Sequence, residues 1–550
     1  MKTYVTTVLF VFCLVLAATG RILDMDFTWV NHYGGHEFDY AGCIATDDNG
    51  HSYVAGTFES TAYFGSYTLE SQGVTDIYII KVDHSGGVLW ARRAGGSLGD
   101  SVVGIALDHA GHFYIAGQFL DEIRFHTTQL VSFGGYDAFI AKYDTSGNVV
   151  WAQNVGGPDW DGAGDITVDD HGQPIITGYF GDTADFDTTP VVSEGAHDIY
   201  VAKLAAAGDL IWVQRAGGTD FDYGYGVAVD GSDHVIVTGE FRGHASFGGT
   251  TLNANSDEMF IAKIDDSGRF LWARQAGGPY EDSGIAVAVD QQGASYVTGS
   301  FMGTADFDTI TLQSEGDEDI FVAKYNASGN ILWARRAGGS SLDVGSDIII
   351  DGASGCIVTG FYAWNGQFGT IPMTSYGRED SFVAKYDEAG NAVWVKGAGG
   401  ISEDRGTGVS MDGEGHIYLT GWFERDNTFD AISITSTGHR DMFVAKLENT
   451  TRVDDVKETA MRPEPFFLFD NAPNPFNAQT TISYWLQDAA NVRMTFFNMQ
   501  GRTVDTMENK MAEPGLHRVT WNAHHLESGL YLYRITAGPY SAVGTCMLIK

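Results

Sequence analysis

A tryptophan followed by a Gly-Gly pair recurs at a nearly constant interval along most of the chain. Consecutive tryptophans of this set are 61 residues apart, except for one interval of 60. The set comprises Trp29, Trp90, Trp151, Trp212, Trp272, Trp333 and Trp394. A period held this strictly indicates an array of similar supersecondary units that stack on one another.

Each repeat contains four short segments with the composition of β-strands, separated by turn residues. In the second repeat these segments are 104–108, 113–119, 137–144 and 148–154. The connections 108–111 and 144–147 begin with Asp and end with Gly, which is typical of hairpin turns. Four antiparallel strands in chain order form a meander with two faces to bury. The array therefore predicts an all-β fold in which meanders stack as the blades of a β-propeller.

The first and the last repeats are incomplete in complementary ways. Complete sets of four strands end at the six tryptophans from Trp90 to Trp394, and a set of only three strands follows at 408–447. The unmatched fourth strand lies at the other end of the array, at 27–35. We therefore predict a seven-bladed β-propeller over residues 21–450. Its N-terminal strand completes the last blade, so the ring has no exposed sheet edge.

Two sets of acidic residues keep the same period. The first acidic ring follows the Gly-Gly pairs and comprises Asp39, Asp100, Asp161, Asp222, Asp282, Asp343 and Asp404. The second comprises Asp76, Asp137, Asp198, Glu258, Asp319, Asp380 and Asp441. The meander places both on the face that carries the connections between second and third strands and between successive repeats, which we call the long-loop face. The first acidic ring either holds Ca²⁺, which takes several oxygen ligands, or binds backbone N–H groups; sevenfold repetition favours this structural role.

Residues on the long-loop face that break the repeat are the candidates for binding a ligand. They are Trp160, His197, Trp364, Arg378, Arg405, His439 and Arg440. They form no recognisable acid–base pair, nucleophile or metal-binding set, so no catalytic residue is assigned. The first hypothesis is a non-enzymatic binding or structural module. The alternative is an extracellular hydrolase or lyase that acts on glycans at the long-loop face.

The termini and the charge indicate an exported protein. Residues 1–20 combine Lys2, an apolar run at 5–18 and small residues before Arg21, which is typical of a signal peptide. No later segment predicts a membrane span in the mature chain. The formal net charge of −39 argues against nucleic-acid partners. Cys43, Cys356 and Cys546 form no recognisable disulfide framework, and we expect a monomer.

The 61-residue period ends after Leu447. Residues 451–465 are charged and contain prolines, which predicts a linker. Short alternating segments then resume at 480–485, 492–498, 517–521 and 530–535. They predict a small immunoglobulin-like β-sandwich over 466–550.

Both parts of the chain resemble known families. The repeats, with Asp-Ile-Phe-Val-Ala-Lys at 319–324 and Gly338-Gly339 after Trp333, resemble the seven-bladed propeller repeats of secreted bacterial proteins. The C-terminal module resembles the sorting domain of the type IX secretion system. The matching residues include Pro473, Asn474, Pro475, Phe476, Gly501, Gly529, Tyr531 and Lys550. These resemblances imply export by the outer-membrane secretion machinery and a place outside the cell, where a glycan or a protein would be the ligand.

Overall fold

The computed structural model describes residues 24–108, 110–352, 355–450, 466–468, 471, 476–486, 489–499, 502–512, 515–538 and 540–550. Within these residues every regular element is a β-strand. The chain divides into two compact units, Met1–Thr451 and Arg452–Lys550. The predicted signal peptide, 1–20, and the predicted linker, 451–465, lie outside the described residues.

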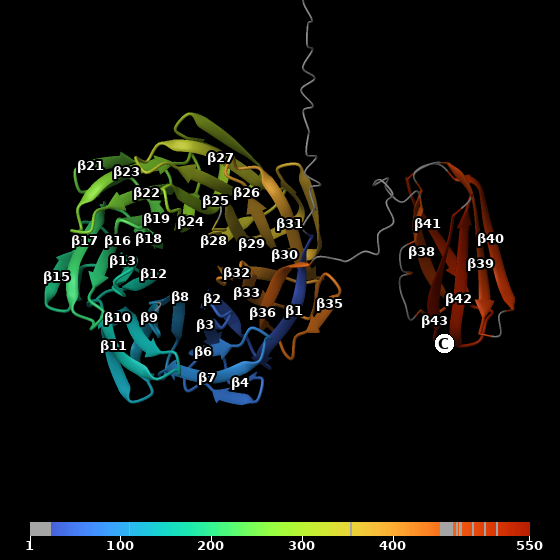
Figure 1. Ribbon diagram of the computed structural model, residues 1–550, viewed down its shortest axis with the longest axis horizontal. Helices are drawn as coiled ribbons and strands as arrows, with labels where there is room; N and C mark the ends of the chain where they lie inside the picture. The colour runs from blue at the N-terminus through green and yellow to red at the C-terminus, as the bar shows by residue number, and fades with distance from the viewer. Residues whose placement is uncertain are drawn as a thin grey trace, which may run out of the picture. The chain divides into compact units, whose positions relative to one another are not determined.

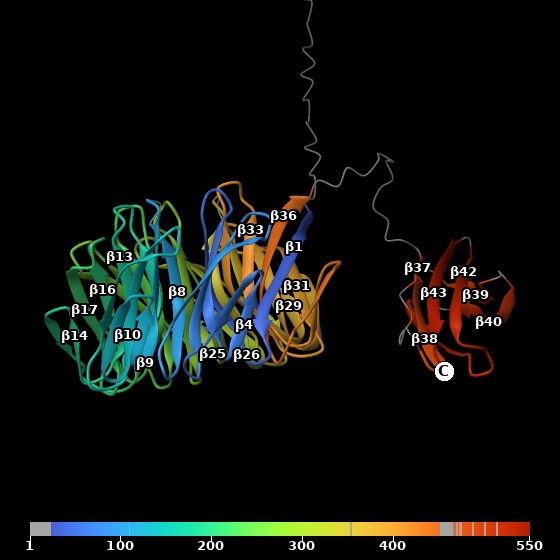
Figure 2. The same cartoon turned by 90° about the horizontal axis from the view of Figure 1, so that it is seen from below.

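Each repeat of the first unit forms an antiparallel group of four strands, which we call a repeat sheet. In the second repeat, β8 (Asp100–Leu107) pairs with β9 (His112–Phe125), β9 with β10 (Thr128–Asp144), and β10 with β11 (Val149–Val155). The repeat sheets stand around a common centre (Figure 1), and their strands run across the thickness of the ring (Figure 2). This all-β arrangement is propeller-like.

The remaining repeat sheets follow the same strand order. Repeat sheet 1 consists of β2 (Tyr40–Thr46), β3 (Ser52–Phe58), β6 (Asp76–Val82) and β7 (Val88–Gly95); repeat sheet 3 of β12 (Gly162–Val168), β13 (Pro174–Phe180), β16 (Asp198–Leu204) and β17 (Leu210–Gly218). Repeat sheet 4 consists of β18 (Asp222–Val229), β19 (Val235–Phe241), β22 (Glu258–Ile264) and β23 (Phe270–Ala276); repeat sheet 5 of β24 (Asp282–Val289), β25 (Ser295–Phe307), β26 (Ile310–Tyr325) and β27 (Ile331–Gly339). Repeat sheet 6 consists of β28 (Val344–Ile350), β29 (Cys356–Phe368), β30 (Ile371–Tyr386) and β31 (Ala392–Gly400); repeat sheet 7 of β32 (Asp404–Met411), β33 (Ile417–Phe423), β36 (Asp441–Thr450) and β1 (Asp24–Gly35).

Repeat sheet 7 is built from both ends of the array. β1 pairs antiparallel with β36, and Trp29 lies opposite Lys446. The two strands lie side by side in both ribbon views (Figures 1 and 2). The predicted pairing of residues 27–31 with the last repeat is therefore confirmed. The outer edge of β36 is covered by the chain's own first described strand.

The connections between second and third strands contain hairpins, where the sequence predicted loops. Some continue the long strands β9–β10, β25–β26 and β29–β30. Others are separate pairs, namely β4 (Thr61–Phe64) with β5 (Tyr67–Glu70), β14 (Thr183–Phe186) with β15 (Thr189–Val192), β20 (His244–Phe247) with β21 (Thr250–Asn253), and β34 (Asp426–Phe429) with β35 (Ile432–Thr435). Each hairpin pairs with the fourth strand of the preceding repeat sheet or with the residue that follows it; Ala337, for example, lies opposite Phe368, and Gly156 pairs with Asp185. The hairpins thus tie neighbouring repeat sheets together by backbone pairing.

These crossings explain the repeated residues. A Cβ atom on Gly339 would lie 1.7 Å from the carbonyl oxygen of Asn365 in the crossing hairpin, so only glycine fits there. The indole of Trp333 donates from Nε1 to the carbonyl oxygen of Glu388 in the next repeat, at 2.9 Å. Apolar side chains of adjacent repeat sheets form shared cores; Ile140 and Ile176, for example, belong to the same buried cluster. The repeated glycines and tryptophans therefore join one repeat to the next.

The second unit has two antiparallel sheets. One has the order β37 (Phe466–Leu468), β38 (Gln479–Leu486), β41 (Gly515–Asn522); the other has the order β40 (Thr503–Ala512), β39 (Ala490–Asn498), β42 (Gly529–Ala537), β43 (Tyr540–Leu548). Both sheets contribute to one core around the buried Trp521. The four strands predicted from the sequence lie within β38, β39, β41 and β42, whereas β37, β40 and β43 were not predicted.

Candidate ligand-binding site at the central channel

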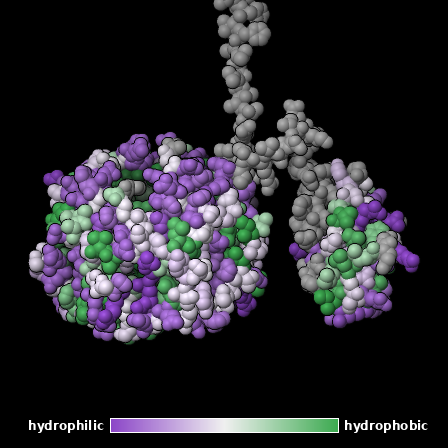
Figure 3. All heavy atoms as spheres, turned by 60° about the horizontal axis from the view of Figure 1, so that its bottom comes forward, coloured by the Kyte–Doolittle hydropathy of each residue, from purple (hydrophilic) through white to green (hydrophobic). Residues whose placement is uncertain are grey.

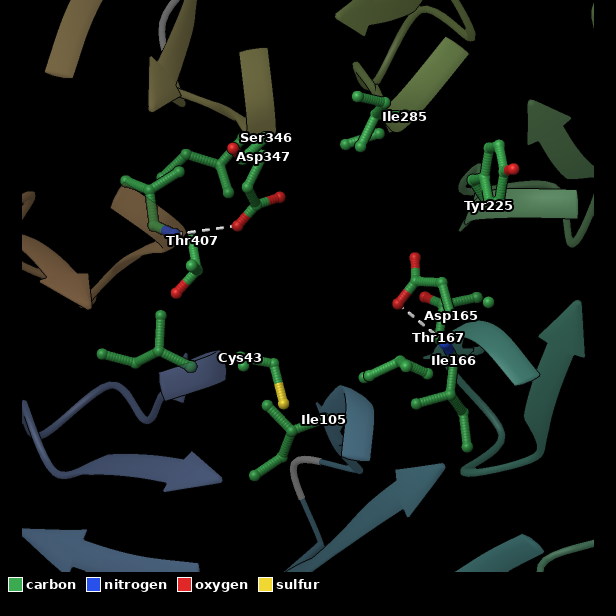
Figure 4. Close-up of a pocket in the computed structure, with 18 of the residues that line it drawn as sticks. Cys43, Ile105, Asp165, Ile166, Thr167, Tyr225, Ile285, Ser346, Asp347 and Thr407 are labelled. Atoms are coloured by element: carbon green, nitrogen blue, oxygen red, sulfur yellow. Dashed lines mark hydrogen bonds between the residues drawn. The ribbon is translucent and has the colours of Figure 1, made fainter. Parts of the chain in front are cut away.

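The first strands of the repeat sheets line a cavity of about 970 Å³ at the centre of the ring (Figure 4). Each of these strands has a β-bulge at the same place, where one residue is left out of the pairing. The bulged residues all line the cavity and are Gly42, Val103, Gly164, Tyr225, Ile285, Ser346 and Thr407. A periodic backbone therefore presents dissimilar side chains to one space. Sequence reasoning missed these positions, although the period aligns them.

Two aspartates follow the bulge and face each other across the cavity (Figure 4). Asp165 accepts hydrogen bonds from the backbone N–H groups of Ile166 at 2.7 Å and of Val227, in the next repeat sheet, at 3.1 Å. Asp347 makes the equivalent bond to Val409, at 2.8 Å. Burial raises the pKa of each carboxyl group to about 7. Both side chains therefore connect neighbouring repeat sheets in addition to lining the cavity.

Arg440 is the centre of a charged and aromatic cluster on the long-loop face. Its guanidinium donates to Glu424 at 2.7 Å, to Glu403 at 3.0 Å and to the hydroxyl of Tyr40 at 3.0 Å. It also lies over the ring of Trp422, 4.1 Å from the ring centre. Planar stacking combined with hydrogen bonds fixes the orientation of this arginine.

Arg405 belongs to the same cluster. Its guanidinium lies 4.0 Å from the ring centre of Phe361 and 5.4 Å from that of Trp422. Its Nε donates to Glu379 at 2.6 Å. The cluster thus contains cations that are already paired with carboxylates and that lie over the buried rings of Phe361 and Trp422.

Two further candidates lie beside this cluster. The ring of His439 stacks on Phe38 at a centre-to-centre distance of 4.9 Å, and Phe38 also lies near Arg440. Arg378 approaches Glu403, the partner of Arg440, at 3.4 Å. The structure therefore brings Arg378, Arg405, His439 and Arg440 together.

Trp160 and His197 each pack against aromatic residues, in two separate sets of contacts that we call together the aromatic cluster. Trp160 packs edge-to-face against Tyr136 at 5.9 Å between ring centres. His197 contacts Tyr179 at 5.2 Å, and its Nδ1 lies 3.3 Å from the hydroxyl oxygen of Tyr223. Burial lowers the pKa of His197, which favours the neutral ring. Edge-to-face rings and a neutral imidazole make this sector mainly apolar.

Trp364 stands apart from both clusters. Its side chain is 60% exposed, and its φ angle is 62°, in the left-handed region. Non-glycine residues, bulky ones above all, seldom occupy this region. Among the described residues, its side chain makes no hydrogen bond or ring contact with another candidate. Elsewhere, the face shown in Figure 3 carries hydrophobic side chains as separate spots among hydrophilic ones.

The first acidic ring lies buried between the repeat sheets. Each of its aspartates accepts a hydrogen bond, 2.6 to 2.8 Å long, from the backbone N–H of the second glycine of the preceding Gly-Gly pair. Burial raises the pKa of six of them to about 7 and that of Asp404 to about 8. Within the described part of the chain, only Asp169, His171 and Asp233 bring three metal-ligating atoms within 4.8 Å of one another. Ca²⁺ binding by the ring stays a prediction.

The C-terminal unit contains several of the predicted sorting residues. Phe476 is buried against Trp521, and its backbone N–H donates to the carbonyl oxygen of Met547 at 2.9 Å. The Tyr531 hydroxyl donates to the backbone of Glu527 at 2.8 Å. Gly529 begins β42, and the side chain of Lys550 donates to the carbonyl oxygen of His524. The remaining predicted residues, Pro473, Asn474, Pro475 and Gly501, lie outside the described residues.

Residues 472–549 match the family model of the secretion system C-terminal sorting domain. This domain indicates export by the type IX secretion system, and the protein is secreted to the cell surface. It also implies contact with the secretion machinery. In the part of the chain that the structure describes, no helix has the length and hydropathy needed to cross a membrane.

The chain is similar to two curated proteins. It is 24% identical over 510 residues to an uncharacterized WD repeat-containing protein, L264, of Acanthamoeba polyphaga mimivirus, covering 74% of this chain and 37% of that protein. It is 24% identical over 280 residues to the regulatory protein FlaEY of Caulobacter vibrioides, covering 46% and 29%. The chain thus spans about a third of the length of these relatives. Among solved structures, PorZ, a surface component of the type IX secretion system of Porphyromonas gingivalis, aligns with 12% identity and a TM-score of 0.29, covering 92% of this chain and 70% of that one.

Proposed function

We propose that the first unit is a seven-bladed β-propeller that binds an extracellular ligand, a glycan or a protein, at the mouth of its central channel on the long-loop face. The strand pairing of the repeat sheets supports the blade count. The observation that carries the binding function is the convergence of side chains that break the repeat. Four of the seven candidates from the sequence come together around Arg440, and two more, Trp160 and His197, each pack among aromatic residues.

The chemistry of the two clusters suits a ligand with both flat apolar faces and polar edges. The ring of Trp160, which is 56% exposed, offers a large face for stacking, and Tyr179 adds a partly exposed ring. The guanidinium of Arg405 offers donors in a fixed plane, because only its Nε is bonded, to Glu379, whereas Arg440 holds the cluster together with all three of its nitrogens. We infer that the first acidic ring, which is bonded to backbone N–H groups, organises the loops of this face and takes no part in binding.

Glycan and protein arrays probed with the mature full-length chain test this proposal. We expect Trp160→Ala to weaken the binding of any captured ligand by about tenfold or more, which corresponds to about 1.4 kcal/mol. Trp364→Ala is the matched control, because Trp364 is equally exposed but belongs to neither cluster, and it should bind like the wild type. Unchanged binding by both Trp160→Ala and Arg405→Ala would place the ligand elsewhere.

A further inference from the structure

The cavity wall formed by repeat sheets 4 and 5 carries three glutamates. Glu240 lies near the end of β19, Glu281 directly precedes β24, and Glu318 lies in β26. Among the described residues, the side chains of Glu281 and Glu318 form no hydrogen bond and no ion pair. This sector of the wall therefore differs from the cluster around Arg440, where every glutamate has an arginine partner.

A nearly buried serine in the same wall has a hydroxyl group without a protein partner. Ser300, in β25, is only 5% exposed and lines the cavity. Its hydroxyl makes no hydrogen bond to any other described residue. The hydroxyl oxygen itself is not fully buried and opens on the cavity, where a ligand or water can satisfy it. Ser300 therefore marks a place where the wall can accept a hydrogen bond from a bound molecule.

Negative charge accumulates around Glu240. Its carboxylate accepts a hydrogen bond from the hydroxyl of Tyr225 at 2.8 Å. Burial, together with the nearby charges of Asp257 and Glu281, raises its pKa. The neighbouring cation, Arg242, is already paired, because its Nε and one terminal nitrogen contact the carboxylate of Asp257. A positive charge placed between Glu240, Glu281 and Glu318 would offset their repulsion.

The spacing of the carboxylates favours an organic cation over a metal ion. The three glutamates do not bring three ligand atoms within 4.8 Å of one another, a condition that only Asp169, His171 and Asp233 meet among the described residues. Ca²⁺ needs its oxygen ligands within 2.3–2.6 Å of the ion. A protonated amine instead donates to separate acceptors, and the face of Tyr225 offers it a cation–π contact.

We propose that this acidic sector, Tyr225, Glu240, Glu281, Ser300 and Glu318, binds the protonated amine of a ligand that enters the channel from the long-loop face. The inference deepens the proposed function, on which it rests, by assigning a positive charge to part of the ligand. Free polyamines and lysine side chains share this chemistry. The three carboxylates along one wall suit a ligand with more than one amine.

Calorimetry of the full-length mature chain with spermidine, with Nα-acetyl-lysine methylamide and with CaCl₂ tests the proposal. We expect both amines to bind, and we expect affinity to fall as salt is added, because the attraction is electrostatic. Replacing both Glu281→Gln and Glu318→Gln should raise the Kd for spermidine by about tenfold or more. Glu388→Gln is the matched control, since Glu388 is an exposed glutamate in a turn of the opposite face; it should change the Kd by less than about twofold.

Several results would overturn the inference. They are an absence of heat with both amines, an unchanged Kd in the double glutamine variant, or displacement of spermidine by low concentrations of CaCl₂. The proposed function has a separate outcome. If an array ligand binds and is lost in Trp160→Ala while neither amine binds, the channel mouth is a ligand site and only its acidic sector has been misassigned. The melting temperature of each variant shows whether it is folded.

Discussion

Asp161 recurs with the period and has a structural role, whereas residues that line the channel do not repeat. Its carboxylate accepts hydrogen bonds from the backbone N–H groups of Gly157 at 2.6 Å and Gly181 at 3.1 Å. The sequence predicted this role because the residue recurs with the period. It did not predict that Tyr225 lines the channel, which depends on the bulge in β18, or that Ser300, on strand β25 of the next repeat sheet, lines it too. A one-residue bulge reverses the direction in which a side chain faces without changing the composition.

The buried aspartates should make stability depend on pH. Burial raises the pKa of Asp161 from 3.8 in the unfolded chain to about 7. The folded state then binds more protons than the unfolded state between about pH 4 and pH 7, so the free energy of unfolding falls as the pH rises through this window. One such group contributes up to about 1.4 kcal/mol per pH unit. We expect denaturant unfolding to give a higher free energy of unfolding at pH 5.5 than at pH 8.

Asp161→Asn is the test of this cause. The variant should be less stable at low pH, because it loses one backbone hydrogen bond, and its stability should change less with pH than that of the wild type. Equal slopes in the two proteins would contradict the role of Asp161. Repeating the series with a chelator separates the effect of protonation from that of bound Ca²⁺. An ion present at a hundred times its Kd would add about 2.7 kcal/mol to the free energy of unfolding. We expect the chelator to have little effect.

At the scale of elements, the crossing hairpins are the feature that the sequence did not reveal. The predicted segments 113–119 and 137–144 lie within β9 and β10, but these strands continue into the hairpin. Four-residue strands such as β4 are too short to show a clear alternation of apolar and polar residues. Their partner is the preceding repeat sheet, a contact that local sequence does not encode. In the C-terminal unit, β40 and β43 are edge strands, with weaker apolar patterns than central strands.

Substitutions at two glycines distinguish the effect of a crossing hairpin on the free energy of unfolding from the effect of chain flexibility. Gly339→Ala places a Cβ atom against the backbone of Asn365 and should lower the free energy of unfolding by about 1–3 kcal/mol or more. Gly249→Ala, in the turn of another hairpin, meets no atom within 4 Å. It should be neutral or stabilise by up to about 1 kcal/mol, since alanine restricts the unfolded chain. Chemical denaturation measures both, and similar losses in the two variants would argue against the crossing.

At the scale of the whole molecule, the sequence predicted the closure of the ring because the missing strand of the last repeat could be matched to the extra strand at the start. The two compact units were also separable, since the period stops where the composition changes. The contacts of the candidate residues were only half predicted. Residues that break the repeat can be found by alignment, whereas the pairing of Arg440 with Glu403 and Glu424 depends on how the strand ends of repeat sheet 7 come together in space.

The two units should have separable tasks in the cell. The first unit has its own buried clusters and closes on its own N-terminal strand. A chain that ends at Thr450 should therefore melt within a few degrees of the first transition of the full-length protein. In the native host it should remain in the periplasm, because the sorting domain at 472–549 is missing. Cell fractionation with protease accessibility measures this, and equal amounts of both forms outside the cell would contradict the sorting role.

Closure by β1 also means that the first strand can pair only after the last repeat is present. Thr28 and Lys446, which are in contact, are 418 residues apart in the chain. Closing a loop of this length costs only about 2 kcal/mol more than closing one repeat of 61 residues, because loop entropy grows with the logarithm of length. Closure therefore affects the rate of folding more than stability, since contacts this distant in sequence form slowly. Until the last repeat has been synthesised, the first strand has no partner, and the edges of the unfinished ring are open to other chains. The protein therefore passes through a vulnerable period whose duration depends on how fast its final repeat is delivered.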